Sequence, residues 1–449
     1  MLRTGQKIKI RIEKIITGGD GMARHDGIVV MVPYAVPGDV LLVEITEAKR
    51  SFARGSIISV ITPSPDRQPP ACRYHFSPEK CGRTHCGGCN FQMLKYPAQI
   101  KAKLSILSDL RFGAAPEIVP AADAFRYRNK IQMPVGGRTG GVLMGFFMPH
   151  SHRIADVRDC MLEPETANSI VAELKHLIND YGIPPYDEDR RKGVLRHIIL
   201  RHSRASGKFM LVFVTMTDSM RSVNEIVRKI VEKFPQITSV HQNINPRKTN
   251  VILGDRTIKI FGENTIKEKI GGLTFEISPG SFFQVNTAQA EKLYETVKKY
   301  AELTGSENVL DVYSGSGGIS LYLARHCRKI TGIEDVASAV ADARKNAAIN
   351  HITNARFLLE SADRALPGTD AARADIVVLD PPRIGCSQQV ISALLRCLPE
   401  KIIYTSCNPA TLARDINLLA KRYKLSGLAM VDLFPQTAHI ECVAKLTRC

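Results

Sequence analysis

A cysteine and a glutamate near the carboxyl end of the chain have the residue types and the setting for covalent chemistry. Cys407 ends the apolar run KIIYTSC beside a serine and an Asn-Pro turn. This position favours an exposed thiol over the inert, buried cysteine that is common next to a strand. Glu441 lies in HIECVAKL among apolar neighbours, so burial is expected to raise its pKa toward that of a useful base. His439 is the rival base. The pattern predicts a thiolate nucleophile that works with a general base.

A glycine-rich turn is expected to hold a cofactor. The segment VLDVYSGSGGISLYLA, residues 309–324, predicts an apolar strand, a turn that lets backbone approach a ligand, and a helix. Glu334 ends the next expected strand, 23 residues after Asp311, where a carboxylate can bind ribose hydroxyls. Asp380 ends the third strand, in LDPPR. Because no P-loop lysine and no full dinucleotide fingerprint are present, the pattern favours S-adenosylmethionine over ATP or NAD.

A cluster of thiols lies far from these residues in the sequence. Cys72, Cys81, Cys86 and Cys89 fall within 18 residues. The chain has eleven cysteines, an odd number, and its N-terminus lacks the apolar segment of a secretory signal, so a disulfide framework is not expected. Clustered thiolates suit an iron–sulfur cluster or zinc. No apolar run approaches the roughly 18 residues of a membrane span, and we expect a cytoplasmic protein without membrane contact.

The elements that must position these residues fall into three expected domains. Residues 6–62 predict short strands separated by glycine and proline turns, which is typical of a small barrel. A proline-rich linker covers residues 63–70, and a helix is expected from Phe91 to Phe112. Residues 125–280 mix strands with a helix over 167–181. From Ser281 onward helices alternate with buried strands, which indicates a doubly wound parallel sheet.

The charge of the chain points to a polyanionic partner. The 61 Lys and Arg residues exceed the 44 Asp and Glu residues, for a net charge of +17, and release of counterions favours binding to phosphates. Seven basic residues and no acid lie between Arg190 and Lys208, on either a solvated strand edge or an RNA-facing surface. Arg126, Arg128 and Lys130 alternate, so one strand face is expected to be basic and to contact phosphate. A surface charge stripe is the alternative.

Two resemblances join these features. The strings ITGGDGMAR and GIVVMVPYAVPGDVLLVEI resemble the TRAM domain, an oligonucleotide-binding-type barrel attached to RNA-modifying enzymes. The strings FFQVN, LDVYSGSGG, LDPPR, YTSCNPATLARD and HIEC, in this order, resemble the RNA uracil-5-methyltransferase family, the m5U enzymes of 23S ribosomal RNA and tRNA. With the cysteine segment, the resemblance covers almost the whole chain.

The resemblance implies a covalent mechanism. Uracil C5 is not nucleophilic enough to attack a methyl sulfonium, so Cys407 would first add to C6, and Glu441 would remove the C5 proton after methyl transfer. The family often has phenylalanine where this chain has tyrosine in LDVYSGSGG. The stretch FLLESAD departs from the family's loop, so Ser361 and Asp363 are both only candidate contacts to the adenine. The implied cofactor site comprises Gln284, Tyr313, Gly318, Glu334 and Asp380.

The ribosomal branch of the family holds a [4Fe–4S] cluster on a C-x5-C-x2-C run and a distant cysteine. Cys86 and Cys89 match the last pair of the run, and Cys160 matches the distant ligand. The first ligand is either Cys72, which fits the sequence context, or Cys81, which fits the spacing approximately. We favour Cys72, with zinc as the alternative metal and a structural role for the cluster, since methyl transfer needs no redox step.

We therefore expect an α/β protein with a Rossmann-like S-adenosylmethionine methyltransferase domain, residues 93–119 and 281–449. An N-terminal OB-type barrel (1–62) and a small α+β iron–sulfur domain (72–92 and 120–280) complete it. The expected activity is methylation of uridine C5 in 23S ribosomal RNA by a monomer, with the tRNA T-loop as alternative substrate. A non-catalytic RNA-binding protein would lack the thiol or the base. An amino-group methyltransferase would carry an aromatic residue after Asp-Pro-Pro, where this chain has Arg383.

Overall fold

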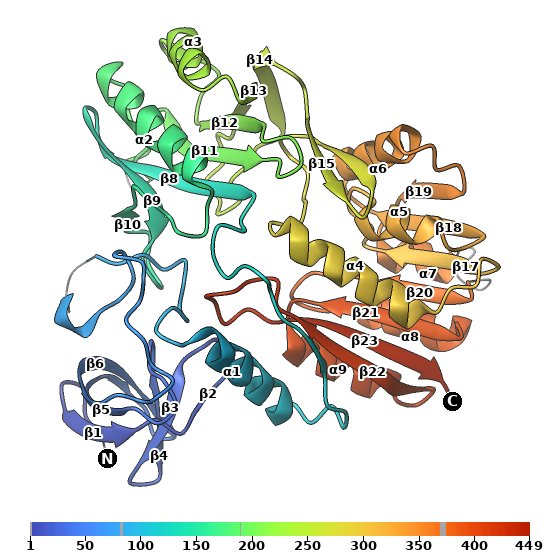
Figure 1. Cartoon of the computed structure of the whole chain (residues 1–449), viewed down its shortest axis with the longest axis horizontal. Helices are drawn as coiled ribbons and strands as arrows, with labels where there is room; N and C mark the ends of the chain where they lie inside the picture. The colour runs from blue at the N-terminus through green and yellow to red at the C-terminus, as the bar shows by residue number, and fades with distance from the viewer. Residues whose placement is uncertain (1, 81–83, 189, 369–373) are drawn as a thin grey trace.

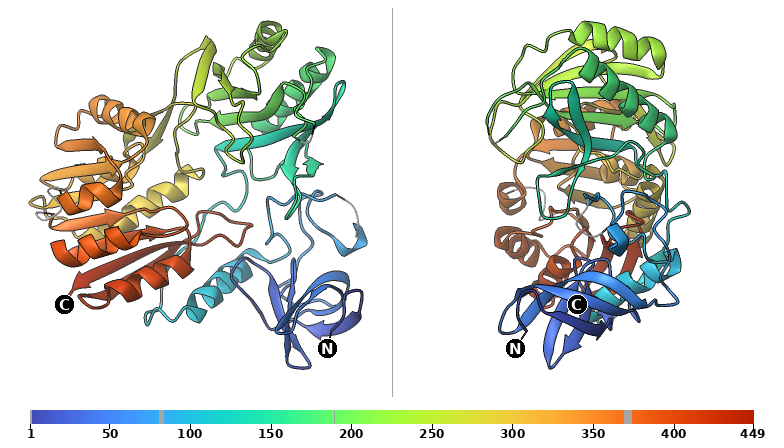
Figure 2. Two further views of the ribbon diagram at one scale, coloured as in Figure 1. Left: turned by 180° about the vertical axis from the view of Figure 1, so that it is seen from behind. Right: turned by 90° about the vertical axis from the view of Figure 1, so that its left-hand side faces the viewer.

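The chain folds into three parts that surround a common centre. The computed structural model describes all residues except 1, 81–83, 189 and 369–373. Figure 1 shows a curled sheet at the N-terminus in blue, a second sheet in green, and a layered sheet in orange and red that ends at the C-terminus. The loop of residues 432–440, in red, projects from the third part toward the centre in Figure 1 and in the reverse view of Figure 2. The expected fold class is confirmed.

The first part is a six-stranded sheet with strand order β1-β5-β6-β4-β3-β2. Its sequence alternates between core and solvent: Ile8 and Ile10 of β1 are buried, and Lys7, Lys9 and Arg11 are exposed. Val30, Leu41 and Ile57 from the other strands complete a small apolar core. The strands are β1 (Lys7–Arg11), β2 (Lys14–Ile15), β3 (Gly21–His25), β4 (Ile28–Val32), β5 (Val40–Ala48) and β6 (Phe52–Thr62).

The segment after the barrel passes through the short helix η1 (Pro78–Lys80) and enters helix α1 (Tyr96–Asp109), which is shorter at both ends than the expected helix over 91–112. Pro97 lies in the first turn, where its missing N–H is harmless. The helix is anchored to the far end of the chain by a fully buried ion pair, 2.5 Å between Lys103 Nζ and Asp432 Oδ1. Strand β7 (Glu117–Val119) follows the helix and pairs with a C-terminal strand.

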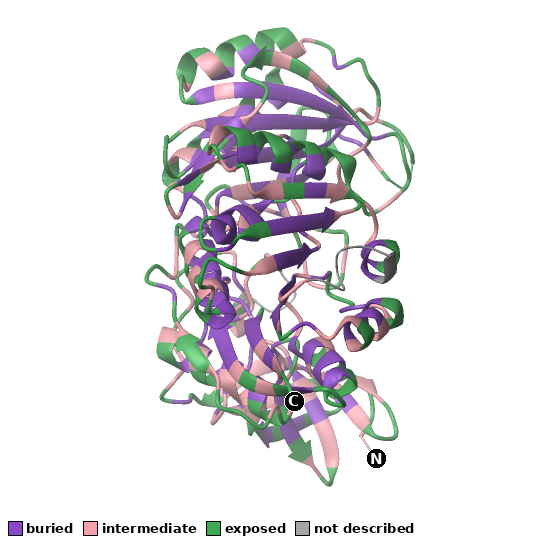
Figure 3. Cartoon of the chain, turned by 90° about the vertical axis from the view of Figure 1, so that its right-hand side faces the viewer, coloured by how far each residue is buried: buried purple, intermediate pink, exposed green. Residues whose placement is uncertain are grey.

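The second part is a seven-stranded sheet of order β10-β9-β8-β11-β12-β13-β14. The strands at its centre are buried over nearly their whole length, because helices cover one face and the third part covers the other. The expected helix over 167–181 is α2, and Figure 3 shows the exposed outer faces of the helices in green over purple strands. The elements are β8 (Lys130–Arg138), β9 (Gly141–Phe147), β10 (Ile154–Asp156), α2 (Glu165–Asp180), β11 (Leu195–His202), β12 (Phe209–Thr215), α3 (Val223–Lys233), β13 (Ile237–Ile244) and β14 (Arg256–Gly262).

The expected basic strand face at Arg126, Arg128 and Lys130 is wrong. Arg126 has a φ of 54°, in the left-handed region, and both arginines precede the strand β8 that begins at Lys130. Arg126 Nη1 donates to the carbonyls of Cys160 (3.0 Å) and Glu163 (2.8 Å), and Arg128 lies 3.7 Å from the Glu163 carboxylate. The alternation therefore does not place the three side chains on one face, because the backbone turns at Arg126 and the loop of residues 160–163 binds the arginines.

The third part is an eight-stranded sheet of order β19-β18-β17-β20-β21-β23-β22-β7, called the C-terminal sheet below. Its first five strands are parallel, and β23 is antiparallel to β21 and β22. Its elements are α4 (Thr287–Ala301), β17 (Asn308–Val312), α5 (Gly318–Ala324), β18 (Lys329–Glu334), α6 (Ala337–Ile349), β19 (Ala355–Leu359), α7 (Ala362–Gly368), β20 (Ile376–Leu379), α8 (Gln388–Cys397), β21 (Lys401–Ser406), α9 (Pro409–Leu419), β22 (Tyr423–Val431) and β23 (Glu441–Arg448).

A two-stranded hairpin connects the second part to the third. It consists of β15 (Ile266–Ile270) and β16 (Leu273–Ile277), within the range that the sequence assigns to the central domain. Its apolar residues, among them Ile266 and Phe275, belong to the same core as Leu293 of α4. Within the described residues, no helix has the length and apolar character that crossing a membrane requires.

Candidate active site

The predicted site residues converge on one edge of the C-terminal sheet. Strands β17, β18, β20 and β21 are parallel neighbours, so their carboxyl ends meet at the same edge. The loops that leave this edge carry the glycine-rich turn after β17, Glu334, Asp380 and Cys407. In open α/β sheets this edge is where ligands bind.

The glycine-rich turn has a constrained backbone. Tyr313 has a φ of 69°, and the N–H groups of Tyr313 and Ser314 both donate to the Ile333 carbonyl at 2.9 and 3.0 Å. Gly318 opens α5, and a Cβ at this position would lie 2.3 Å from Tyr294 Oη. Gly318 is therefore explained by the close approach of the buried Tyr294, in addition to any approach of a ligand to the turn.

Unsatisfied polar atoms lie next to this turn. The Glu334 carboxylate accepts hydrogen bonds from the N–H groups of Gly315 and Val336, each at 2.9 Å, which ties the turn to the end of β18. Asp311 Oδ1 and Ser314 Oγ are buried, and neither has a hydrogen-bond partner among the described residues. Burial raises the pKa of Asp311 to about 7. Since buried polar atoms are normally paired, this corner of the site fits a polar ligand such as S-adenosylmethionine.

Tyr313 and Gln284 are two further expected cofactor residues. Tyr313 lies in the turn, is half-buried, and packs against the apolar core that contains Cys386. Gln284 lies in the segment that precedes α4; its carbonyl accepts from Asn129 Nδ2 at 2.9 Å. The same segment reaches the turn through Ser316 Oγ, 3.4 Å from the Phe282 carbonyl oxygen.

The two candidate adenine contacts follow β19. Asp363 accepts a hydrogen bond from Ser387 Oγ, the residue that caps α8. The Ser361 N–H donates to Glu360 at 3.0 Å. Both residues stay candidate contacts, because these bonds engage only one carboxylate oxygen of Asp363 and only the backbone N–H of Ser361.

Cys407 and Glu441 are brought together by the antiparallel pairing of β21 with β23. Ser406 pairs with Cys442, so the adjoining residues Cys407 and Glu441 lie at the same end of the two strands. Asn408 caps α9 immediately after the cysteine, accepting from the Ala410 N–H at 3.2 Å. Cys407 thus lines a cavity of about 240 Å³, called the nucleophile pocket below, together with Thr17, Gly18, Asn90, Ile106, Arg383, Asn408, Pro409, Ala438, His439 and Ile440.

Arg383 opposes the upward pKa shifts that burial and nearby acidic groups cause in this site. Glu441 is 4% exposed, and its burial, followed by the nearby Asp380, raises its pKa well above the usual range. Burial and then the charge of Glu441 raise the pKa of Cys407. The nearby positive charge of Arg383 opposes both shifts. In the sequence, Arg383 is notable only because it replaces the aromatic residue of the amino-group methyltransferase motif. Its position after the proline pair of LDPPR, at the same sheet edge as Asp380, is the signal that could have identified it as a site residue.

The structure also bears on the rival base. Arg383 Nη2 and His439 Nδ1 are 3.1 Å apart, so the guanidinium donates to this ring nitrogen. Burial, followed by Arg383, lowers the pKa of His439 to about 4. A neutral imidazole whose Nδ1 already accepts a hydrogen bond is poorly suited to remove a proton.

The cysteine cluster forms a second cavity that adjoins the first. Cys72, Cys86, Cys89 and Cys160 all line a cavity of about 290 Å³, and His439 lines both this thiol cavity and the nucleophile pocket. Cys81 lies outside the described residues. Among the residues that are described, no three His, Cys, Asp or Glu side chains form a group close enough to hold a single metal ion.

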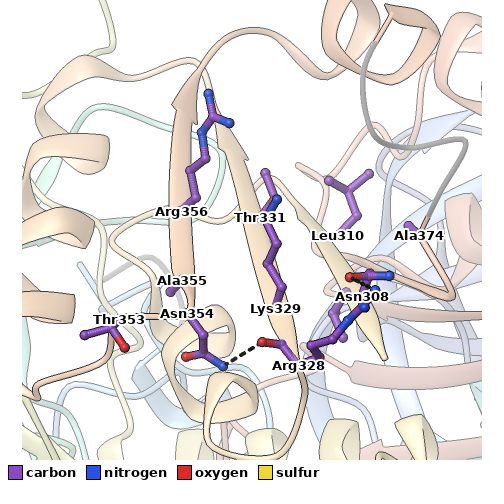
Figure 4. Close-up of a pocket in the computed structure, with 11 residues that line it drawn as sticks. Asn308, Leu310, Arg328, Lys329, Thr331, Thr353, Asn354, Ala355, Arg356 and Ala374 are labelled. Atoms are coloured by element: carbon purple, nitrogen blue, oxygen red, sulfur yellow. Dashed lines mark hydrogen bonds between the residues drawn. The ribbon is translucent and has the colours of Figure 1, made fainter. Parts of the chain in front are cut away.

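A further cavity, of about 620 Å³, lies at the amino ends of β17, β18 and β19 (Figure 4). Arg328, Lys329 and Arg356 line it, and Arg328 Nη2 donates to Asn308 Oδ1 at 2.8 Å. None of the site residues named above lines this cavity, and it lies at the opposite edge of the sheet from the glycine-rich turn. It is therefore not the cofactor site.

The raised pKa of Glu441 makes stability depend on pH in a defined direction. The folded protein holds the Glu441 proton more tightly than the unfolded chain, so the free energy of unfolding falls as pH rises from about 4.3, the ordinary glutamate pKa, through the raised value. Glu441→Gln removes this titration. We expect the melting temperature of the variant to exceed that of the native protein by an amount that grows with pH, measured by thermal unfolding between about pH 4 and 8. A difference in melting temperature that stays constant across this pH range would contradict a buried, titrating Glu441.

Two family models and several known proteins match this chain. The model of the family described as tRNA (Uracil-5-)-methyltransferase matches residues 220–449, and that of the TRAM domain matches residues 2–58. An uncharacterized RNA methyltransferase of Halalkalibacterium halodurans is 37% identical, with 98% of this chain and 96% of the relative covered. One from Listeria monocytogenes is 38% identical, with 99% and 98% covered.

A solved structure extends the likeness to three dimensions. It is that of the Pyrococcus abyssi tRNA (uracil-54, C5)-methyltransferase in complex with S-adenosyl-L-homocysteine. Its TM-score is 0.80 at 29% identity, with 98% of this chain and 99% of that chain covered. The chain therefore belongs to the tRNA (uracil-5-)-methyltransferase family, as an S-adenosylmethionine-dependent RNA methyltransferase with an N-terminal TRAM domain.

Proposed function

We propose that the protein methylates C5 of a uridine in RNA through a covalent bond between Cys407 Sγ and C6 of the base. The observation that carries the proposal is the meeting of Cys407 and Glu441 at one end of β21 and β23, beside Arg383 and at the sheet edge that also carries the glycine-rich turn. A buried carboxylate and a partly buried thiol with one shared cation suit a reaction that needs a nucleophile and a base in succession.

The residues of the site would act in the following order. The Cys407 thiolate, stabilised by Arg383, adds to C6, and the C5–C6 π electrons move to C5 and O4. S-adenosylmethionine supplies the methyl group, which C5 takes while the sulfonium sulfur keeps the electron pair of the broken bond. Glu441 then removes the C5 proton. The double bond re-forms, the Sγ–C6 bond breaks, and Cys407 leaves as a thiolate.

We propose 23S ribosomal RNA as the substrate, and a uridine of the tRNA T-loop as the second candidate. The net charge of +17 suits either polyanion. The four cysteines around one cavity favour the ribosomal branch, whose members carry a cluster, and some tRNA enzymes of the family carry one as well. The Pyrococcus abyssi enzyme, described as acting on uracil 54 of tRNA, favours the second candidate. We further propose a monomer in the cytoplasm, where the free thiols of the described cysteines stay reduced.

The test is to incubate the protein with labelled S-adenosylmethionine and with ribosomal RNA or tRNA that contains 5-fluorouridine. Fluorine at C5 cannot leave as a proton, so the C6 adduct should remain and survive denaturation. An adduct with ribosomal RNA and not with tRNA supports the first substrate, and the reverse pattern supports the second. The absence of an adduct with both RNAs would exclude uridine C5 methylation.

We also propose that Cys72, Cys86, Cys89 and Cys160 hold a [4Fe–4S] cluster with a structural role. The fit rests on four thiols that face one cavity of about 290 Å³. Zinc, which also binds four thiolates, is the alternative metal. Among the described residues, no three potential ligands form a group that could hold a single metal ion, so the proposal rests on the shared cavity. When bound, the cluster would join the segment after the barrel to the loop of Cys160.

Cys72→Ser is expected to lose most of the bound iron and sulfide, because it removes one of four thiolates. The native protein should contain about four iron and four sulfide per chain, measured by metal analysis and visible absorption. Cys397→Ser, on α8 and away from the cavity, is the matched control. Loss of iron in Cys81→Ser but not in Cys72→Ser would transfer the ligand role to Cys81, and zinc in place of iron would overturn the cluster.

A further inference from the structure

The barrel contributes to the nucleophile pocket. Thr17 and Gly18, in the loop between β2 and β3, line the same cavity as Cys407, nearly the full length of the chain away in sequence. The barrel is seated firmly at this place. Ile15 and Val36 belong to one apolar core with α1, and Lys14 Nζ lies 2.7 Å from Asp109 Oδ2 at the end of that helix.

Asn90 links the barrel loop to the loop that enters β23. Its Nδ2 donates to the Gly18 carbonyl at 3.2 Å, and its Oδ1 accepts from the Ala438 N–H at 2.8 Å. The Asn90 N–H donates in turn to the Gln436 carbonyl at 3.2 Å. Because Ala438 stands three residues before Glu441, one amide side chain joins the barrel to the strand entry that carries the proposed base.

The contact leaves no room for a side chain on the barrel loop. Gly19 has a φ of +97°, and a Cβ there would lie 2.6 Å from Asn90 Nδ2 and 2.7 Å from Ala438 Cβ. Gly27, at the β3–β4 turn of the same barrel, also has a positive φ, +78°, but nothing lies within 4 Å of its Cβ position. Comparing alanine variants of Gly19 and Gly27 therefore separates the effect of backbone strain from that of the close contact with Asn90 and Ala438.

We infer that Asn90 is a positioning residue that holds the barrel loop at Thr17 and Gly18 as the outer wall of the pocket for the target uridine. The inference rests on the proposed function, since it assigns this pocket to the base that Cys407 attacks. Its consequence is that the barrel does more than add affinity for RNA. It helps to place the base against the nucleophile, so loss of the Asn90 link should slow adduct formation even when RNA is saturating.

Asn90→Asp tests the link with almost no change of size. The carboxylate still accepts from the Ala438 N–H but cannot donate to the Gly18 carbonyl. We expect kcat and the rate of adduct formation on 5-fluorouridine RNA to fall about 10-fold, the effect of one lost hydrogen bond, with the Kd for RNA changed less than twofold. Gly19→Ala should show at least the same loss, and Gly27→Ala should match the native rates.

The outcomes separate this inference from the proposed function. Native protein that forms no adduct defeats the function itself. If the native protein forms the adduct and Asn90→Asp retains native kcat, or loses only RNA affinity, the positioning role is overturned. Should Gly19→Ala fail to fold, shown by the loss of a cooperative melting transition, the nearly isosteric Asn90→Asp still decides.

Discussion

Cys407→Ala is expected to abolish the covalent adduct and to lower kcat by at least about 10⁴-fold, because no other group can activate uracil C5 once the thiolate is gone. Binding of S-adenosylmethionine should be unchanged within twofold, since the glycine-rich turn and Glu334 do not depend on the thiol. The measurement is transfer of labelled methyl groups to RNA at saturating concentrations, with a denaturing gel of 5-fluorouridine RNA for the adduct.

The matched control is Cys397→Ala, which removes another partly buried free thiol, on α8. This control should keep native turnover and a native adduct. A Cys407→Ala protein that still forms a denaturation-resistant adduct would assign the nucleophile to another residue. One that still methylates RNA without an adduct would show a reaction that is not covalent.

Glu441→Gln is expected to stop the reaction at its last stage, with covalent protein–RNA complex accumulating on ordinary uridine RNA. The glutamine keeps the shape of the side chain but cannot accept the C5 proton, so the methylated base stays bonded to Cys407. Turnover should fall about 10² to 10⁴-fold, the usual contribution of a general base. The complex is measured on a denaturing gel, with the methyl label and the RNA label in the same band.

His439→Gln provides the comparison for the rival base. Because Arg383 donates to His439 Nδ1 and burial lowers the pKa of the ring to about 4, we expect slower turnover from a disturbed Arg383 but no accumulated complex. Accumulation in His439→Gln and not in Glu441→Gln would exchange the two roles.

The sequence predicts the parallel part of the site well. Strands β17, β18, β20 and β21 are short apolar runs between helices, and they carry Asp311, Glu334, Asp380 and Cys407 at or next to their carboxyl ends. Parallel strands of this kind place their carboxyl ends at one edge. For these four residues, the family motifs and the strand pattern predict the same arrangement. The proximity of Cys407 and Glu441 is harder to predict from the sequence, because it depends on the antiparallel register of β23, which an apolar pattern alone does not fix.

Residues that act across loops were missed for a physical reason. Arg383 and Asn90 form side-chain hydrogen bonds with His439 and Ala438, 56 and 348 positions away, and such contacts leave no periodic trace in the sequence. The expected basic face at Arg126 fails in the same manner. Alternation predicts a strand, but the carbonyls of the loop at Cys160 bind the arginine and the backbone turns before β8 begins.

Two contacts also limit the order in which the chain can fold during synthesis. They are the ion pair between Lys103 and Asp432 and the pairing of β7 with β22. Residues 96–119 are made early, yet their partners are among the last to be synthesised. The sheet of β8 to β14 can fold on the ribosome before α1 is packed, because the partner that buries Lys103 of α1 has not yet been synthesised. These contacts of the catalytic core can therefore form only after synthesis has passed Asp432.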